Sequence, residues 1–114
     1  MAAWTDAATA RAHWPDAASL PDATLGRLLE AASVQCATYA TDSLRTAVDV
    51  ALAVATPPPP PAVMACILHA RELYAASLRD GDVIGGPDYA IRARPLTGVV
   101  KALLRPDRGR PVIG

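Results

Sequence analysis

Few residues in this chain have a type and spacing that could support catalysis or metal binding. His69 and Glu72 lie three residues apart in a run with helical periodicity, so they could face one side of a helix and share a metal ion. No third ligand stands at a matching spacing. Asp80 and Asp82 resemble half of a calcium loop, but the downstream glutamate of such a loop is missing. We therefore expect no metal site, and a simple turn near these two aspartates.

Motifs of enzymes are also missing. The chain has no G-x-S-x-G elbow, no phosphate-binding Walker loop and no H-E-x-x-H pair. Cys36 and Cys66 each lie inside an apolar helical pattern and lack zinc-ligand spacing, which predicts buried free thiols. His13, next to Trp14, is expected at the surface or in side-chain packing. The sequence predicts no catalytic, cofactor-binding or metal-ligating residue, and hence not an enzyme.

The charge of the chain is distributed unevenly. Its 114 residues have a net charge of zero, but residues 1–87 carry five arginines against nine acids, and residues 88–114 carry six basic residues against two acids. Such asymmetry indicates an acidic partner for the C-terminal part, or a solvated basic terminus. Nucleic acid is a further candidate, although aromatic residues make up only 4% of the chain and provide no stacking platform. The candidate basic contacts are Arg92, Arg94, Lys101, Arg105, Arg108 and Arg110.

The elements that position these residues must belong to one small domain. A chain of this length has no room for a second core, and its apolar content is dominated by 25 alanines, with no phenylalanine. Alanine buries little area, so the predicted core is thin. Either the helices pack closely through alanine, or a subunit completes its core against neighbours. No signal peptide or membrane span is predicted, so we expect a cytoplasmic protein with no membrane partner.

Apolar periodicity predicts four helices, at about residues 5–14, 21–40, 62–79 and 97–105. Pro15 and Pro106 end the first and the last of them, because the residue before proline avoids the helical conformation. Steps of three and four residues give one apolar stripe on each longer helix. The predicted core stripe consists of Leu25, Leu28, Leu29, Cys36, Ile67, Tyr74, Leu103 and Leu104.

The segment at residues 41–61 can be read in two ways. Val48, Val50, Leu52 and Val54 alternate with other residues at the period of a strand, whereas Leu44, Ala47, Val48, Ala51, Leu52 and Ala55 fit a helix. We expect an extended arm or loop here. The five prolines at residues 57–61 favour stiff polyproline II, which would set the start of the following helix.

The C-terminal third is expected to be extended. Gly85 and Gly86 permit a turn, and the alternation that follows predicts a strand or hairpin at residues 83–94. Its candidate interface residues are Tyr89, Ile91, Arg92 and Arg94. Residues 106–114 cannot form a core of their own, so we expect an extended arm there. The expected fold is mainly α: a small helical bundle with an extended loop, a β-hairpin-like element and an extended C-terminal arm.

The stretch "DGDVIGGPDYAIRARPLTGVVKALLRPDRGRPVIG" resembles the end of the head-to-tail connector (adaptor) proteins of long-tailed bacteriophages. The similarity lies in an aromatic-containing strand at 89–94, a Pro-Leu step at 95–96, a short helix at 99–106 and a basic tail at 107–114. "ATARAHWPDA", "LLEAASVQCATYA" and "PPPPPAVMACILHARELYAAS" are similar to earlier parts of that pattern, in the same order. The chain departs from it at residues 41–56, which have no clear counterpart, and in the length of the proline run.

This resemblance implies a structural protein of the virion neck, the head–tail junction, assembled in the host cytoplasm. Such proteins form a homo-oligomeric ring, typically a dodecamer, beneath the portal protein, and extend the channel through which DNA passes without specific binding. They also present a surface for a stopper or tail-terminator protein. The residues implied to bind a partner through the C-terminal arm are Arg105, Arg108, Arg110, Pro111, Val112 and Ile113. The alternative is a small nucleic-acid-binding protein that uses the basic C-terminal region.

Overall fold

The computed structural model describes residues 3–79 and 94–105. The described chain is mainly helical, as expected, and those residues contain no strand. Its elements are α1 (Ala7–His13), a 3-10 helix η1 (Pro15–Ser19), α2 (Asp22–Tyr39), α3 (Asp42–Ala53), α4 (Pro60–Arg79) and α5 (Gly98–Leu104). The predicted strand or hairpin at 83–94 lies outside the described residues except for Arg94, and the predicted arm at 106–114 lies wholly outside them.

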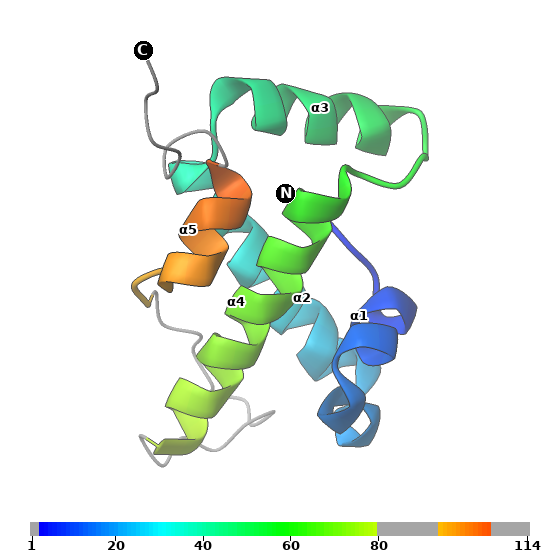
Figure 1. Ribbon diagram of the computed structural model, residues 1–114. Helices are drawn as coiled ribbons and strands as arrows, with labels where there is room; N and C mark the ends of the chain where they lie inside the picture. Colours follow the sequence, from blue (N-terminus) through cyan, green and yellow to red (C-terminus); the bar gives the residue numbers. More distant parts are fainter. Residues whose placement is uncertain (1–2, 80–93, 106–114) are drawn as a thin grey trace.

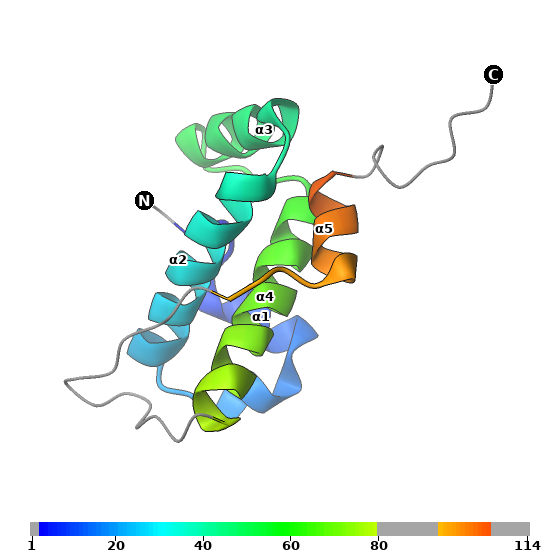
Figure 2. The ribbon, with the colours of Figure 1, turned by 90° about the vertical axis from the view of Figure 1, so that its left-hand side faces the viewer.

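Three helices form the centre of the molecule. Helix α4 lies between α2 and α5 and packs against both (Figures 1 and 2). The stripe on α2 is completely buried, and Ile67 of α4 and Leu104 of α5 meet it in the same core. Tyr74 and Leu103 are half-buried at its edge. Seven of the other buried core positions are alanines, which is how helices with a thin apolar content pack closely: Ala10, Ala17, Ala32, Ala40, Ala62, Ala65 and Ala70.

The N-terminal elements cover one side of α2 and α4. Helix α1 begins after Asp6, whose side chain accepts a 2.7 Å hydrogen bond from the N–H of Thr9, and ends before Pro15 as expected. The chain then makes the short helix η1, which sequence patterning did not predict. Arg11 holds η1 in place by donating from Nε to the carbonyl of Ala17 at 3.3 Å. It also donates to the carbonyl of Leu20 at 2.8 Å and pairs with Asp22 at 2.6 Å. These contacts tie α1 to the start of α2.

The five prolines divide between a connection and a helix. Residues 57–59 form the lead-in after α3, whereas Pro60 and Pro61 already belong to the first turn of α4, two residues earlier than expected. Proline suits this turn because its missing N–H would have no partner inside the helix. The carbonyl of Pro59 accepts from the N–H groups of Ala62 and Val63, so the run starts the helix directly. The stiff lead-in is therefore shorter than the five residues expected.

The expectation of an extended arm at residues 41–61 is wrong, because most of the segment is helix α3. Thr41 caps the helix by accepting from the N–H of Leu44 at 3.2 Å, and Asp42 lies in the first turn, where the helix dipole favours a negative charge. The strand-like alternation has another cause: α3 carries apolar residues on two sides, and only one side packs against the chain. In both views α3 lies across one end of the bundle (Figures 1 and 2).

Candidate functional site

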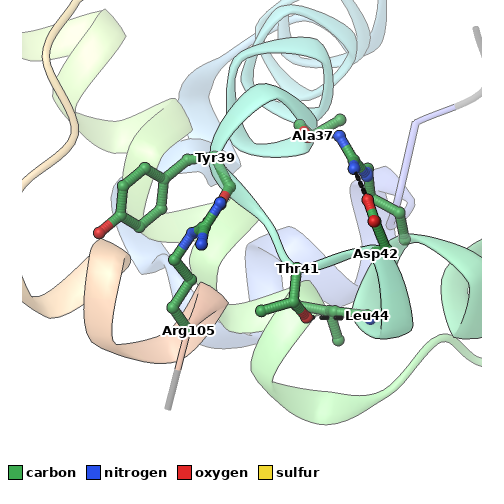
Figure 3. A network of polar contacts seen from close by, with 7 residues as sticks. Ala37, Tyr39, Thr41, Asp42, Leu44 and Arg105 are labelled. Atoms are coloured by element: carbon green, nitrogen blue, oxygen red, sulfur yellow. Dashed lines mark hydrogen bonds and ion pairs between the residues drawn. The ribbon is translucent and has the colours of Figure 1, made fainter. Parts of the chain in front are cut away.

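Polar contacts from two other helices meet at the end of α2 that lies next to α3. Helix α2 has no basic residue in its own last turn, so its final carbonyl groups need partners from elsewhere. Arg105, just after α5, donates from Nε to the carbonyl of Tyr39. Its guanidinium lies 4.8 Å from the centre of the Tyr39 ring, close enough for a cation–π contact (Figure 3). Lys101, one turn earlier, places Nζ 5.7 Å from the centre of the same ring.

A second arginine serves the same helix end from the other side. Arg45 of α3 donates from Nη1 to the carbonyl of Ala37 at 3.1 Å and also pairs with Asp42 (Figure 3). Cations near the negative end of a helix dipole stabilise it by roughly 0.3–1 kcal/mol when partly exposed. The two arginines therefore attach the first turn of α3 and the end of α5 to the last turn of α2.

The contact between Tyr39 and Arg105 places the end of α5 against the last turn of α2. Arg105 is half-buried and continues directly into residues 106–114, the segment that carries most of the expected partner-binding residues. Its hydrogen bond and ring contact place that exit at the same end of the bundle as α3 (Figures 1 and 3). Of the expected arm residues, only Arg105 is described. The other five, Arg108, Arg110, Pro111, Val112 and Ile113, lie outside the described residues, as do Tyr89, Ile91 and Arg92 of the candidate strand.

Gln35 joins α2 to α4 and to the segment before α5. Its Oε1 accepts from the backbone N–H of Arg94 at 3.2 Å and lies 2.6 Å from Nε2 of the buried His69. Because a carbonyl oxygen can only accept, Nε2 carries the proton, and Nδ1 is left buried without a partner. Burial lowers the pKa of His69 below its ordinary value of 6.5, although Glu72 acts in the opposite direction. His69 is thus a neutral structural residue.

Ser33 makes a comparable junction in the centre of the core. Its Oγ accepts from the N–H of Trp4 at 2.9 Å, donates to the carbonyl of Leu29 at 2.8 Å and lies 3.3 Å from Sγ of Cys66. Cys66 and Cys36 are buried free thiols, as expected. Burial raises the pKa of Cys66 to about 11 and that of Cys36 to about 12. Both thiols are therefore protonated and unreactive at neutral pH.

Hollows on the described surface include a groove beside α4 and a smaller hollow beside the proline run, and an apolar side of α3 is also exposed. A groove of about 610 Å³ lies between the end of α1, α4 and the start of α5, where Trp14 packs edge to face on Tyr74 with ring centres 5.7 Å apart. A smaller hollow of about 370 Å³ lies between the N-terminal residues, the end of α3 and the proline run. Val50 of α3 and Val54, which follows the helix as its C-cap, are 58% and 63% exposed. The larger groove is also lined by Asp16, Arg71 and Glu72.

Sequence reasoning did not identify Tyr39, Gln35, Ser33 or Arg45 as functional or connecting residues. Tyr39 and Gln35 had a visible signal, because each is a hydrogen-bonding residue in the last turns of a strongly apolar helix, close to where that helix must end. The partners could not be read from the sequence, since Arg105 and Arg94 lie about sixty residues further along the chain.

Two kinds of site are missing from the residues that the structure describes, a metal cluster and a membrane-spanning helix. No cluster of three or more histidine, cysteine or acidic side chains there could hold a metal ion. Within the same residues, no helix has both the length and the apolar character needed to cross a bilayer.

In comparisons with known proteins, no protein-family model, no curated protein and no solved structure matches this chain. Its function is therefore inferred from its residues and their arrangement.

Proposed function

We propose that this protein is a structural subunit of a bacteriophage head-to-tail connector, a ring beneath the portal that extends the DNA channel. The order of sequence elements described above resembles that class of protein. A helical domain with a thin, alanine-rich core and an apolar face open to solvent suits a subunit completed by its neighbours. A net charge of zero also suits a channel wall, because strong phosphate binding would hold the DNA in place.

The observation that carries the proposal is the anchor of Arg105 on Tyr39. It fixes the start of a basic, proline-containing segment, residues 106–114, at one end of the bundle. A docking arm requires a fixed attachment point and a segment that has no core of its own. The fixed attachment point limits the volume that the arm must search for its partner. The portal protein, and a stopper or tail-terminator protein on the other side of the ring, are the proposed partners.

The test is a truncation that leaves the anchor in place. A protein ending at Arg105 should retain the helicity and thermal midpoint of the full chain, yet fail to co-assemble with portal rings in negative-stain images and native mass spectra. The matched control replaces only Arg108 and Arg110 by Gln, which keeps the length of the arm. Attachment of the truncated protein to portal at full strength would contradict the docking role.

The alternative function, nucleic-acid binding by the basic C-terminal region, predicts a different dependence on salt. A protein that neutralises several phosphates loses affinity steeply as salt rises, with a log–log slope of about −0.9 per phosphate contact on duplex DNA. For a connector we expect weak DNA binding at physiological salt. Tight binding of DNA by the isolated protein, with a slope that falls when residues 106–114 are removed, would favour the alternative and count against the connector.

A further inference from the structure

Helix α3 has a second apolar stripe that faces away from its own chain. The side that packs inward consists of the buried Val48 and Ala51, with Leu44 and Leu52 half-buried beside them. Ala47, Val50 and Val54 follow one another at steps of three and four residues, so they lie in one line along the helix, and all three are exposed. A helix that is apolar on two sides is usually covered on both.

The exposed stripe stands out against the rest of the described surface. Large apolar side chains are exposed at only five positions there, and Val50 and Val54 are two of them, on one line of one helix. Asp49, which precedes Val50 and lies about 100° around the helix from it, is exposed and makes no ion pair within the described residues. The outer side of α3 therefore combines an aliphatic ridge with a carboxylate along one edge.

The outer side of α5 has the complementary character. Gly98 and Ala102 lie one turn apart on its exposed side, and a methyl group built on Gly98 would meet no atom within 4 Å. Val99, 63% exposed, lies at one edge of this shallow strip, and Lys101 at the other edge. Neither α5 nor the adjoining Arg105 contributes an acidic group. Small residues allow another helix to come close, and the basic edge attracts a carboxylate.

We propose that the outer side of α3 in one copy of this chain packs on the outer side of α5 in a second copy. Val50 and Val54 would lie over Gly98 and Ala102, and Asp49 would reach Lys101. The charge of the whole chain is distributed in the same sense as these two surfaces. Acidic residues are in excess before residue 88, where α3 lies, and basic residues are in excess after it, where α5 lies. A second copy is therefore the partner that offers both a matching shape and the opposite charge.

The symmetry of this contact follows from the position of the two surfaces. In Figure 1, α5 lies on the left of the molecule, whereas the C-terminal half of α3, which carries Val50 and Val54, lies on the right. A contact between two different surfaces is heterologous, and repeated it closes a ring or extends as a filament, instead of stopping at a dimer. The inference rests on the proposed function, because it identifies the subunit contact within the connector ring.

Cysteine cross-linking tests the pairing directly. The native thiols are buried and protonated, so they should not react with a short bismaleimide in the folded protein. A mixture of the Val50→Cys and Ala102→Cys proteins should give a cross-linked dimer, whereas each protein alone should not. A chain with both changes should give a ladder of oligomers, and Ala23→Cys, exposed on α2, replaces either partner as the matched control.

Charge reversal provides the second measurement. Asp49→Lys and Lys101→Asp should each weaken self-association by at least about fivefold, and combining the two proteins, or the two changes in one chain, should restore it. Sedimentation equilibrium at low and high salt measures the association. Cross-linking of the Val50→Cys protein to itself, or weakening with no restoration, would overturn the pairing of α3 with α5.

The outcomes separate this inference from the proposed function. Rings on portal that show neither the cross-linking pattern nor the charge rescue would leave the connector standing and reject this subunit contact. Cross-linked ladders from a protein that does not attach to portal would support the contact and reject the connector. Absence of mixed cross-links even in portal-bound rings would count against the contact.

Discussion

Helix α3 differs from the bundle of α2, α4 and α5 in how much of its apolar surface it buries. The bundle buries its apolar residues on helices that pack against one another, and Ser33 and Gln35 bind several of its interior polar groups. Helix α3 has a similar apolar content but buries mainly Val48 and Ala51, and leaves Val50 and Val54 in solvent. Its attachment depends heavily on polar contacts at its first turn, where Arg45 reaches the end of α2.

This difference indicates that the apolar residues of the two regions have different roles. Apolar surface that is buried within the chain contributes to the free energy of unfolding, at roughly 25 cal/mol per Å². Apolar surface that stays exposed contributes nothing to folding and becomes useful only on association. Substitutions in the bundle should therefore change stability, and substitutions on the outer side of α3 should change assembly.

The largest expected effect comes from placing a charge in each region. Leu28→Asp puts a carboxylate into a site with no exposed surface and should destabilise the protein by more than about 4 kcal/mol, enough to unfold it. Val50→Asp, the matched change on α3, should change stability by less than about 1 kcal/mol. Circular dichroism during urea unfolding measures both. A folded, helical Leu28→Asp protein would show that the core stripe is misassigned.

A smaller effect is expected from removing a serine hydroxyl. Ser33→Ala leaves the buried N–H of Trp4 without an acceptor and should destabilise the protein by about 1–3 kcal/mol. Ser43→Ala, at an exposed position of α3, should stay within about 0.5 kcal/mol of the parent. Equal losses at the two sites, measured by urea midpoints at unchanged slope, would remove the distinction between the regions.

Acid should weaken the bundle through His69. Because the pKa of His69 is lowered on folding, the unfolded chain binds the proton more readily, and stability falls as the pH drops below about 6.5. In His69→Gln this part of the pH dependence should disappear, and the exposed His13→Gln serves as the control. Unfolding midpoints at pH 7.5, 6.5 and 5.5 measure it. A pH profile that His69→Gln leaves unchanged would contradict the buried, neutral state of this histidine.

The smallest expected effects concern the backbone. Ala55 follows α3 with a φ of 55°, in the left-handed region, and Thr56 donates back to the carbonyl of Ala51, which is the arrangement of a helix end that favours glycine. Ala55→Gly should therefore stabilise the protein by about 0.5–1 kcal/mol.

The reciprocal change in the bundle should act in the same direction. Gly26→Ala in α2 adds a methyl group that meets no atom within 4 Å, and it should also add about 0.5–1 kcal/mol. The two changes are far apart in the chain, so thermal midpoints of the single and double variants should add. A loss of stability in Ala55→Gly would show that the αL conformation does not end α3.

Helix boundaries followed from local chemistry wherever that chemistry was unambiguous. Pro15 ended α1, and Thr97 began α5 by accepting from the N–H of Val100, both as the sequence predicts. The error at residues 41–61 arose because valines and alanines on two sides of a helix produce strand and helix periods together. The cap at Thr41 and the pair of Asp42 and Arg45 favoured the helix, and these polar signals carried more information than the apolar period.

The candidate site was predictable only in part. The basic character of the C-terminal region is visible in the sequence, and it led to Arg105 as an arm residue. That Arg105 would bind the end of α2 depends on a contact across 66 positions of the chain. Long-range contacts of this kind are set by how the helices pack, and no local pattern encodes them.

By itself, the sequence determined a mainly helical fold, two buried thiols, the apolar stripe of α2 and a basic C-terminal region, because each depends on composition, local propensity or short-range periodicity. Only the tertiary structure decided which side of α3 is buried, which groups Gln35 and Ser33 join, and where Arg105 is anchored. These features depend on the relative positions of elements far apart in the chain. They arise because only some of the apolar side chains are buried in the shared core. The residues that remain outside form the surface that a partner can contact.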